Sequence, residues 1–141
     1  MSDADVGGPF GTGLPIDTMM SRPRPDVVLL AVEGELDTLT APRLAADLKA
    51  ALGVALDEGS ALVVDLSEVT FLASSGLAVL VDGARRAGTA ATRLSLVTAS
   101  RAVTRPLEVT GADTLFDTYA DLASALAAVA HLRPLLHPRA E

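Results

Sequence analysis

A chain of 141 residues is long enough to bury one hydrophobic core, and half of its residues are hydrophobic while only 3% are aromatic, so the core must be aliphatic. Eighteen acidic residues against eleven basic ones give a formal net charge of −7, which disfavours direct binding to nucleic acids. The absence of cysteine excludes disulfides, catalytic thiolates and redox sensing by thiols.

The two ends of the chain differ in composition from its middle. Residues 1–13 are rich in glycine and polar residues, and they predict a disordered N-terminal tail. The acidic start lacks the basic and apolar regions of a secretory signal, and no apolar run reaches the ~18 residues that a bilayer requires. We therefore expect a cytoplasmic protein without membrane contacts. Residues 131–141 contain two prolines and predict a loose C-terminal tail.

Between these tails, a single domain over residues 14–130 is expected to begin with two strands. Alternating apolar residues over 14–20 predict a short edge strand, and the prolines within 21–26 predict a loop. The Val- and Leu-rich segment 27–33 predicts a second strand, which ends at Gly34 to Asp37.

The next predicted element is a helix of about four turns. Thr40 is its predicted N-cap, and Gly59 is its predicted end. Its apolar face is formed by leucines that recur at every fourth position, namely Leu44, Leu48, Leu52 and Leu56.

The rest of the domain alternates strands with helices. Strands are predicted over 61–66, 93–98 and 115–119, and helices after Ser75 to about Arg86, from Arg101 to about Val109 and from Asp121 onward. Pro106 should leave the second of these helices kinked or short, because proline removes a helical hydrogen bond. This order predicts an α/β fold with a mixed sheet of about five strands, mostly parallel with an antiparallel first edge strand, and about four helices.

Two polar segments follow strands of this sheet. Ser74 and Ser75 precede a helix, where the helix dipole favours negative charge, and Asp37 follows an earlier strand. Ligands and partners usually approach a parallel sheet at the carboxyl ends of its strands. We expect the two segments to be neighbours if their strands pair side by side.

Three segments of the chain together resemble the STAS domain family, and within it the bacterial anti-sigma factor antagonists. The resemblance covers roughly residues 14–130, and its motifs are specific only in combination. The segments are Val32 to Asp37 with Thr40 and Ala41, Val63 to Ser67 with Val69 to Leu77, and Leu94 to Val97 with Val103, Arg105 and Val109 to Gly111.

The resemblance implies a STAS-like fold and a partner-switching mechanism. An unphosphorylated antagonist binds an anti-sigma factor, often also a serine kinase, and thereby frees a sigma factor. The kinase phosphorylates the serine before the motif's glycine, by position Ser75, and a cognate phosphatase reverses this. The partner-binding residues implied for this chain are Gly34, Glu35, Leu36, Asp37, Ser74, Ser75, Gly76 and Leu77.

The chain departs from the family pattern at Ala73, where the family commonly has aspartate. A carboxylate that could orient the serine hydroxyl or contact the kinase is therefore missing. Three readings stay open: the protein is permanently in its binding form, it relies on Asp37 alone, or it has lost the switch. The last reading makes it a STAS scaffold or sensor module that does not use phosphorylation.

Simpler structural roles compete with these functional ones. Ser74 or Ser75 could cap the helix, and Gly34 and Asp37 could merely form a turn. The only histidines, His131 and His137, fall outside the predicted domain and have no acidic companions, so neither a metal site nor a Ser-His-Asp triad is predicted. A small α/β enzyme is the third alternative, but no catalytic constellation and no cofactor motif supports it.

Overall fold

The computed structural model describes the backbone of residues 16–136 and the side chains of residues 16–129, so the predicted tail over residues 1–13 lies outside the described part. The described chain forms one sheet with the strand order β2-β3-β4-β5-β6. Only β2 is antiparallel to its neighbour, which confirms the expected mixed sheet. The strands are β2 (Asp17–Arg24), β3 (Val27–Leu36), β4 (Ala61–Leu72), β5 (Leu94–Val97) and β6 (Asp117–Tyr119).

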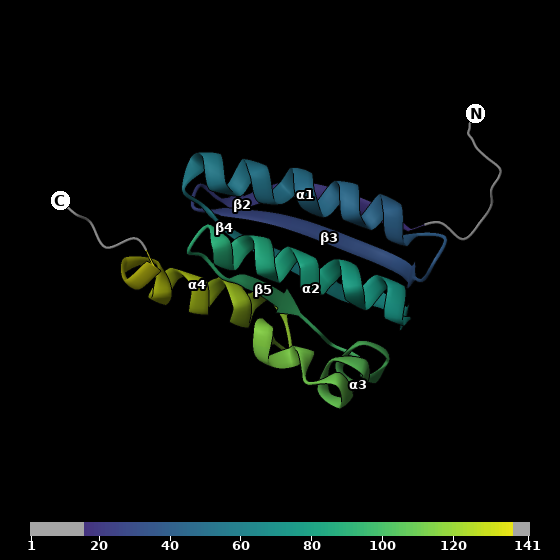
Figure 1. Ribbon diagram of the computed structural model, residues 1–141. Helices are drawn as coiled ribbons and strands as arrows, with labels where there is room; N and C mark the ends of the chain where they lie inside the picture. Colours follow the sequence, from purple (N-terminus) through teal and green to yellow (C-terminus); the bar gives the residue numbers. More distant parts are fainter. Residues whose placement is uncertain (1–15, 137–141) are drawn as a thin grey trace.

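Helices cover both faces of this sheet (Figure 1). The helices are α1 (Ala41–Glu58), α2 (Ser74–Thr89), α3 (Arg101–Thr110) and α4 (Leu122–Leu136). Alternate residues of β3 point to opposite faces, so that Val28 and Leu30 pack in the larger cluster with α1 and α2, while Val27 and Leu29 pack in the smaller cluster with α4. As predicted, the core is almost entirely aliphatic; Phe116 is the one aromatic side chain in its larger cluster.

Helices α1 and α2 lie side by side on their face of the sheet (Figure 1). They can approach closely because Gly83 of α2 has no side chain: a β-carbon there would be 2.6 Å from Cδ2 of Leu48 on α1. Helix α1 ends at Gly59, which has a φ of 65° and so confirms the predicted C-cap. Within residues 16–136, none of the helices combines the length and the apolar character that a membrane crossing requires.

The first strand lies later in the chain than its residues predicted. Strand β2 runs through Pro23 to Arg24, and the turn is confined to Pro25 and Asp26, so the predicted loop over 21–26 is wrong. Proline is tolerated because β2 is an edge strand, where an N–H group can remain unpaired. The register between β2 and β3 also shifts between Ser21 and Arg24.

Strands β3 and β4 are both longer than predicted, and this extension positions the candidate site. The paired register continues to Leu36 beside Leu72, well beyond the last pairing between β4 and β5 at Asp65. The extension contains exposed polar residues such as Glu68 and Thr70, because part of it is covered on one face only. The predicted ends at residues 33 and 66 are therefore wrong, and α2 begins almost directly after β4.

The C-terminal third also differs from the prediction in detail. The predicted strand over 115–119 is confirmed as β6 but is shorter, because Leu115 belongs to a 3-10 helix, Ala112–Leu115, that precedes it. Helix α3 is short, as expected, with Pro106 inside it. Helix α4 continues to Leu136, so the predicted tail boundary at residue 131 is wrong. Asp121 accepts a hydrogen bond from the Ser124 N–H at 2.7 Å, which confirms the predicted cap of α4.

Candidate functional site

The two polar segments meet at the carboxyl ends of β3 and β4. Because these strands are parallel neighbours, the loop after β3 and the first turn of α2 leave the sheet side by side. The Ala73 N–H donates a hydrogen bond of 2.8 Å to the Leu36 carbonyl, which joins the two segments through their backbones. Figure 1 shows the end of β3, the start of α2 and helix α3 at the same end of the molecule. The expected neighbourhood of Asp37 and Ser74–Ser75 is confirmed.

The contact between the segments at the surface is made by two hydroxyls. Ser75 Oγ and Thr38 Oγ1 lie 3.4 Å apart, and Ser75 is partly exposed while Thr38 is exposed. The sequence reasoning named Ser75 but missed Thr38. Thr38 could have been found from its position directly after Asp37, because it follows the carboxyl end of β3 and β3 is the neighbour of β4, which precedes Ser75.

Asp37 binds its own loop and no residue of α2. Its Oδ1 accepts hydrogen bonds from the Leu39 N–H at 2.9 Å and the Thr40 N–H at 3.1 Å, and it lies 3.2 Å from the Thr40 hydroxyl. The Thr40 hydroxyl in turn donates to the Glu35 carbonyl at 2.7 Å. Asp37 therefore holds the loop in shape, and its carboxylate stays partly exposed. Thr40 is the N-cap residue by position, but its side chain makes no capping bond.

The remaining predicted residues of the β3 segment are divided between surface and core. Gly34 has a φ of 116° at a register irregularity of the β3–β4 ladder, a conformation that strongly favours glycine. The Glu35 side chain is exposed, whereas Leu36 is completely buried. Of this segment, Glu35 and Asp37 are thus the residues whose side-chain charges a partner could reach.

The first turn of α2 begins at Ser74, earlier than the predicted start after Ser75. Ala73 is the N-cap residue and has extended backbone angles, and no side chain caps the helix. The interpretation of Ser74 or Ser75 as a helix cap is therefore wrong, because both already lie inside the helix. Ser74 is exposed, Gly76 is buried and Leu77 is partly buried, so the two serines and Leu77 carry the accessible surface of this turn.

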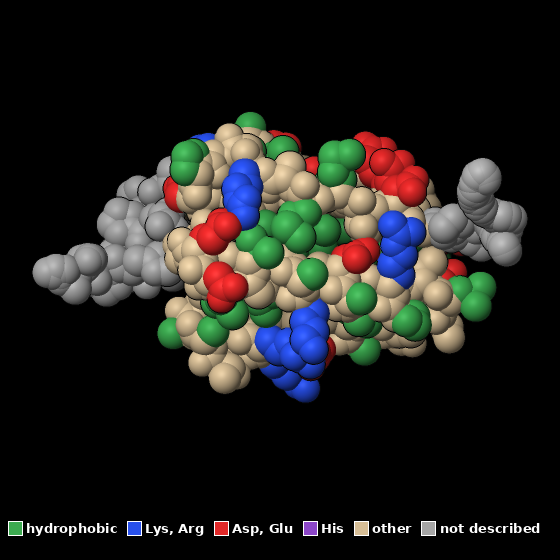
Figure 2. Space-filling model, turned by 90° about the horizontal axis from the view of Figure 1, so that it is seen from above, with side chains coloured by type: hydrophobic (Ala, Val, Ile, Leu, Met, Phe, Trp, Pro, Cys, Tyr) green, Lys and Arg blue, Asp and Glu red, His purple; other side chains and the backbone are tan. Residues whose placement is uncertain are grey.

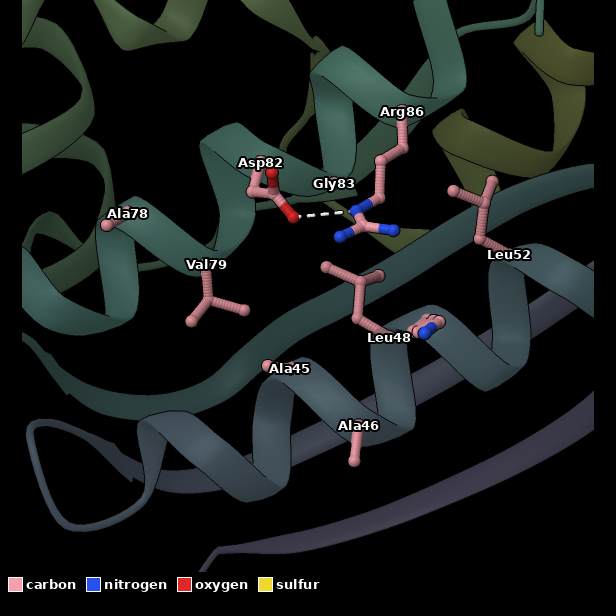
Figure 3. A pocket seen from close by; sticks show the side chains of 10 residues that line it. Ala45, Ala46, Leu48, Leu52, Ala78, Val79, Asp82, Gly83 and Arg86 are labelled. Carbon is pink, nitrogen blue, oxygen red and sulfur yellow. Dashed lines mark hydrogen bonds and ion pairs between the residues drawn. The ribbon is translucent and has the colours of Figure 1, made fainter. Parts of the chain in front are cut away.

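A separate hollow of about 360 Å³ lies between α1 and α2, away from these residues. Figure 3 shows its lining, with Leu48 and Leu52 from α1 opposite Val79 from α2. The Arg86 Nε donates to the Asp82 carboxylate at 2.7 Å on its rim. Seen from above, hydrophobic side chains gather in the middle of the face, with charged side chains of both signs around them (Figure 2). Nothing in the structure indicates what would cover this hollow.

Titratable side chains do not form a metal site in the part of the chain that the structure describes: no group of three or more His, Cys, Asp or Glu is arranged to hold an ion. Among the described residues, the hydroxyl of Ser75 has Thr38 as its hydrogen-bonding partner and no carboxylate. The site therefore presents an accessible hydroxyl beside a loop with carboxylates, and no described side chain is placed to activate the hydroxyl as a nucleophile.

Comparison with known proteins gives a consistent result. The family model described as Mlab, STAS domain, matches residues 19–117. The anti-sigma-F factor antagonist RsfB of Mycobacterium tuberculosis is 36% identical over 104 residues, which cover 73% of this chain and 81% of RsfB.

Solved structures agree with this match. The crystal structure of an anti-sigma factor antagonist from Mycobacterium paratuberculosis has a TM-score of 0.70 and 34% identity, covering 82% of this chain and 94% of that one. The phosphorylated form of the Bacillus cell fate determinant SpoIIAA has a TM-score of 0.59 and covers 80% of this chain and 99% of its own. Its identity of 18% shows a shared fold alone.

Proposed function

This chain belongs to the STAS domain family, and on that premise we propose that it is an anti-sigma factor antagonist. In this proposal it binds an anti-sigma factor through the surface formed by the β3–α1 loop and the first turn of α2, and so releases a sigma factor in the cytoplasm. Phosphorylation of Ser75 ends the binding, and a cognate phosphatase restores it. The role is that of a regulatory binding protein and not of an enzyme.

The observation that carries this proposal is the pairing of Ser75 with the loop. The Ser75 hydroxyl is partly exposed and lies 3.4 Å from the Thr38 hydroxyl, so a group attached to Ser75 would stand at the junction of both segments. A partner that covers Asp37 and the start of α2 would have to cover Ser75 as well. A change at this one hydroxyl would therefore alter the centre of the interface.

The proposed modification is a phosphoryl transfer that the protein undergoes and does not catalyse. A kinase transfers the γ-phosphoryl group of ATP to the Ser75 oxygen; the oxygen–phosphorus bond to ADP breaks, and the hydroxyl proton is released. The phosphatase hydrolyses the ester with water to inorganic phosphate and restores the hydroxyl. The phosphate adds a charge of about −1.5 to −2 at neutral pH.

The helix explains why such a charge would act on binding and leave the fold intact. Ser75 lies in the first turn of α2, where no side chain satisfies the free N–H groups, and negative charge there is favourable by roughly 0.3–1 kcal/mol. At a closed interface the same charge would be desolvated next to the acidic loop, which costs several kcal/mol. A cost of roughly 3 kcal/mol lowers affinity about a hundredfold.

The test uses the purified anti-sigma factor of the source organism and isothermal titration calorimetry. Wild-type protein should bind, and incubation with the kinase and Mg-ATP should place phosphate on Ser75, as located by fragmentation mass spectrometry. Ser75→Ala should bind but accept no phosphate, whereas the neighbouring control Ser74→Ala should still accept phosphate on Ser75. Phosphorylated protein that binds as tightly as the unmodified form would contradict the switch.

One observation favours a second candidate, a STAS scaffold or sensor module without the switch. Ala73 stands at the N-cap of α2 without a side-chain oxygen, where the family commonly has aspartate. If that carboxylate is needed for recognition by the kinase, Ser75 stays unmodified and the protein works without the switch. In that case no phosphate appears on Ser75 after incubation with the kinase and Mg-ATP, and Ala73→Asp restores modification.

A further inference from the structure

Helix α3 and the end of β4 form an open hollow of about 430 Å³, which we call the α3 hollow. It is continuous with the proposed binding surface, because Phe71 is paired with Glu35 in the β3–β4 ladder and precedes Ala73 by two residues. Its lining includes Phe71, Leu72, Arg101, Arg105, Pro106 and Val109.

The α3 hollow carries two arginines that have no ion-pair or hydrogen-bond partner among the described side chains. Arg101 and Arg105 are exposed and lie one turn apart on α3, so their side chains project on the same side of the helix. Neither forms an ion pair or a hydrogen bond with another described side chain. By contrast, the guanidinium groups of five other arginines each contact a carboxylate, namely those of Arg22, Arg24, Arg43, Arg86 and Arg93.

The same hollow exposes apolar surface beside these charges. Phe71 is 49% exposed and Val109 is 71% exposed, and they rank among the large hydrophobic residues that the fold leaves in water. Single exposed hydrophobic residues need no explanation, but aromatic and arginine side chains together are enriched at protein interfaces. Exposed apolar side chains beside two arginines in one hollow match a segment that carries an apolar side chain flanked by carboxylates.

We propose that the α3 hollow binds an acidic, apolar segment of the same anti-sigma factor that covers Ser75. The inference rests on the proposed function and adds a second point of contact to it. The surface covered by the partner would then carry both negative and positive side chains. The carboxylates are those of Glu35 and Asp37, and the guanidinium groups are those of Arg101 and Arg105. Complementary charges of both signs fix the orientation of a docked partner and exclude partners that lack the pattern.

The proposal is tested by calorimetry with the same anti-sigma factor in low salt. The double variant R101E/R105E should raise the dissociation constant at least tenfold, since it replaces attraction by like-charge repulsion. Phe71→Ser should raise it several-fold. The matched control is Arg85→Glu, because Arg85 is another exposed arginine without an ion pair, but it lies near the far end of α2. The dissociation constant of this control should stay within twofold of that of wild type. Raising the salt concentration should reduce the difference in dissociation constant between wild type and R101E/R105E, because salt screens charges.

The outcomes separate this inference from the proposed function. Thermal unfolding followed by circular dichroism checks that each variant is folded. If wild type binds and R101E/R105E binds equally well, the α3 hollow is not part of the interface, while the proposed function stands. If wild type does not bind the anti-sigma factor at all, both proposals fail. If R101E/R105E keeps its affinity but loses a self-association of the free protein in sedimentation, the occupant is a second copy and the proposal is wrong.

Discussion

Gly76 packs directly against Leu36: a β-carbon on Gly76 would lie 2.8 Å from the Leu36 β-carbon and 3.0 Å from the Leu36 carbonyl oxygen. This contact seats the first turn of α2 on the end of β3. It also sets the distance between the helix that carries Ser75 and the loop that carries Thr38. The glycine is therefore a spacing element of the candidate site.

Gly76→Ala should destabilise the protein by about 1–2 kcal/mol, because the cost of overpacking against backbone exceeds the helix propensity that alanine gains. Urea unfolding measures the effect. Gly88→Ala in the same helix is the matched control, since nothing lies within 4 Å of a β-carbon there. It should stabilise by up to about 1 kcal/mol. Equal effects of the two substitutions would refute the spacing role.

Asp37 has a structural task and a charge, and two substitutions separate them. Asp37→Ala removes the acceptor for the Leu39 and Thr40 N–H groups and should cost about 1 kcal/mol of unfolding free energy. Asp37→Asn keeps an acceptor oxygen and should cost less. If the partner binds the negative charge of Asp37, then Asp37→Asn should lower the affinity for the anti-sigma factor as much as Asp37→Ala does. If Asp37→Asn instead lowers affinity less than Asp37→Ala, in line with its smaller loss of stability, Asp37 acts only by holding the loop in shape.

Ala73 leaves α2 without a side-chain cap, so Ala73→Asp should stabilise the protein by about 1 kcal/mol. The added carboxylate can accept a hydrogen bond from a free N–H of the first turn. The control is Ala90→Asp at the other end of the same helix, where a negative charge opposes the helix dipole and no gain is expected. Chemical unfolding of both variants decides whether the position or merely the added charge matters.

A negative charge at residue 75 should leave the free protein folded. Ser75→Glu is expected to change the unfolding free energy by no more than about 1 kcal/mol and in the stabilising direction, because it interacts with the positive end of the α2 dipole. Thr89→Glu, at the last residue of α2, should act in the opposite direction. Destabilisation by Ser75→Glu would mean that loss of partner binding upon phosphorylation reflects a damaged fold.

The cap of α4 predicts a dependence of stability on pH. The hydrogen bonds from Ser124 lower the pKa of Asp121 below its ordinary value of 3.8. A carboxyl group whose pKa is lowered by folding contributes stability that is present above 3.8 and is lost as the pH falls through its folded pKa. The stability difference between wild type and Asp121→Asn should therefore shrink below pH 4. A difference that stays constant from pH 7 to pH 3 would contradict this role.

Local patterns of the sequence determined the architecture. Leucines at every fourth position indicate the buried face of α1, and a run of apolar residues indicates that the start of β4 is buried. Both patterns are visible within a short stretch of sequence. The alternation of strands and helices then requires parallel strands, and parallel neighbours bring Asp37 and Ser75 to one end of the sheet. For this reason the place of the candidate site could be inferred before the fold was known, whereas the family was recognised from the resemblance of three motif segments.

Only the tertiary structure decided what each side chain at that place does. Asp37 binds its own loop, Ala73 occupies the cap position, and Thr38 is the residue that meets Ser75. The extension of β4 past Leu66 and the shared hollow of Phe71, Arg101 and Arg105 were likewise not predictable from the sequence. These features depend on contacts between residues distant in the chain. A local sequence pattern does not show that Thr38, and not its neighbour Asp37, contacts Ser75.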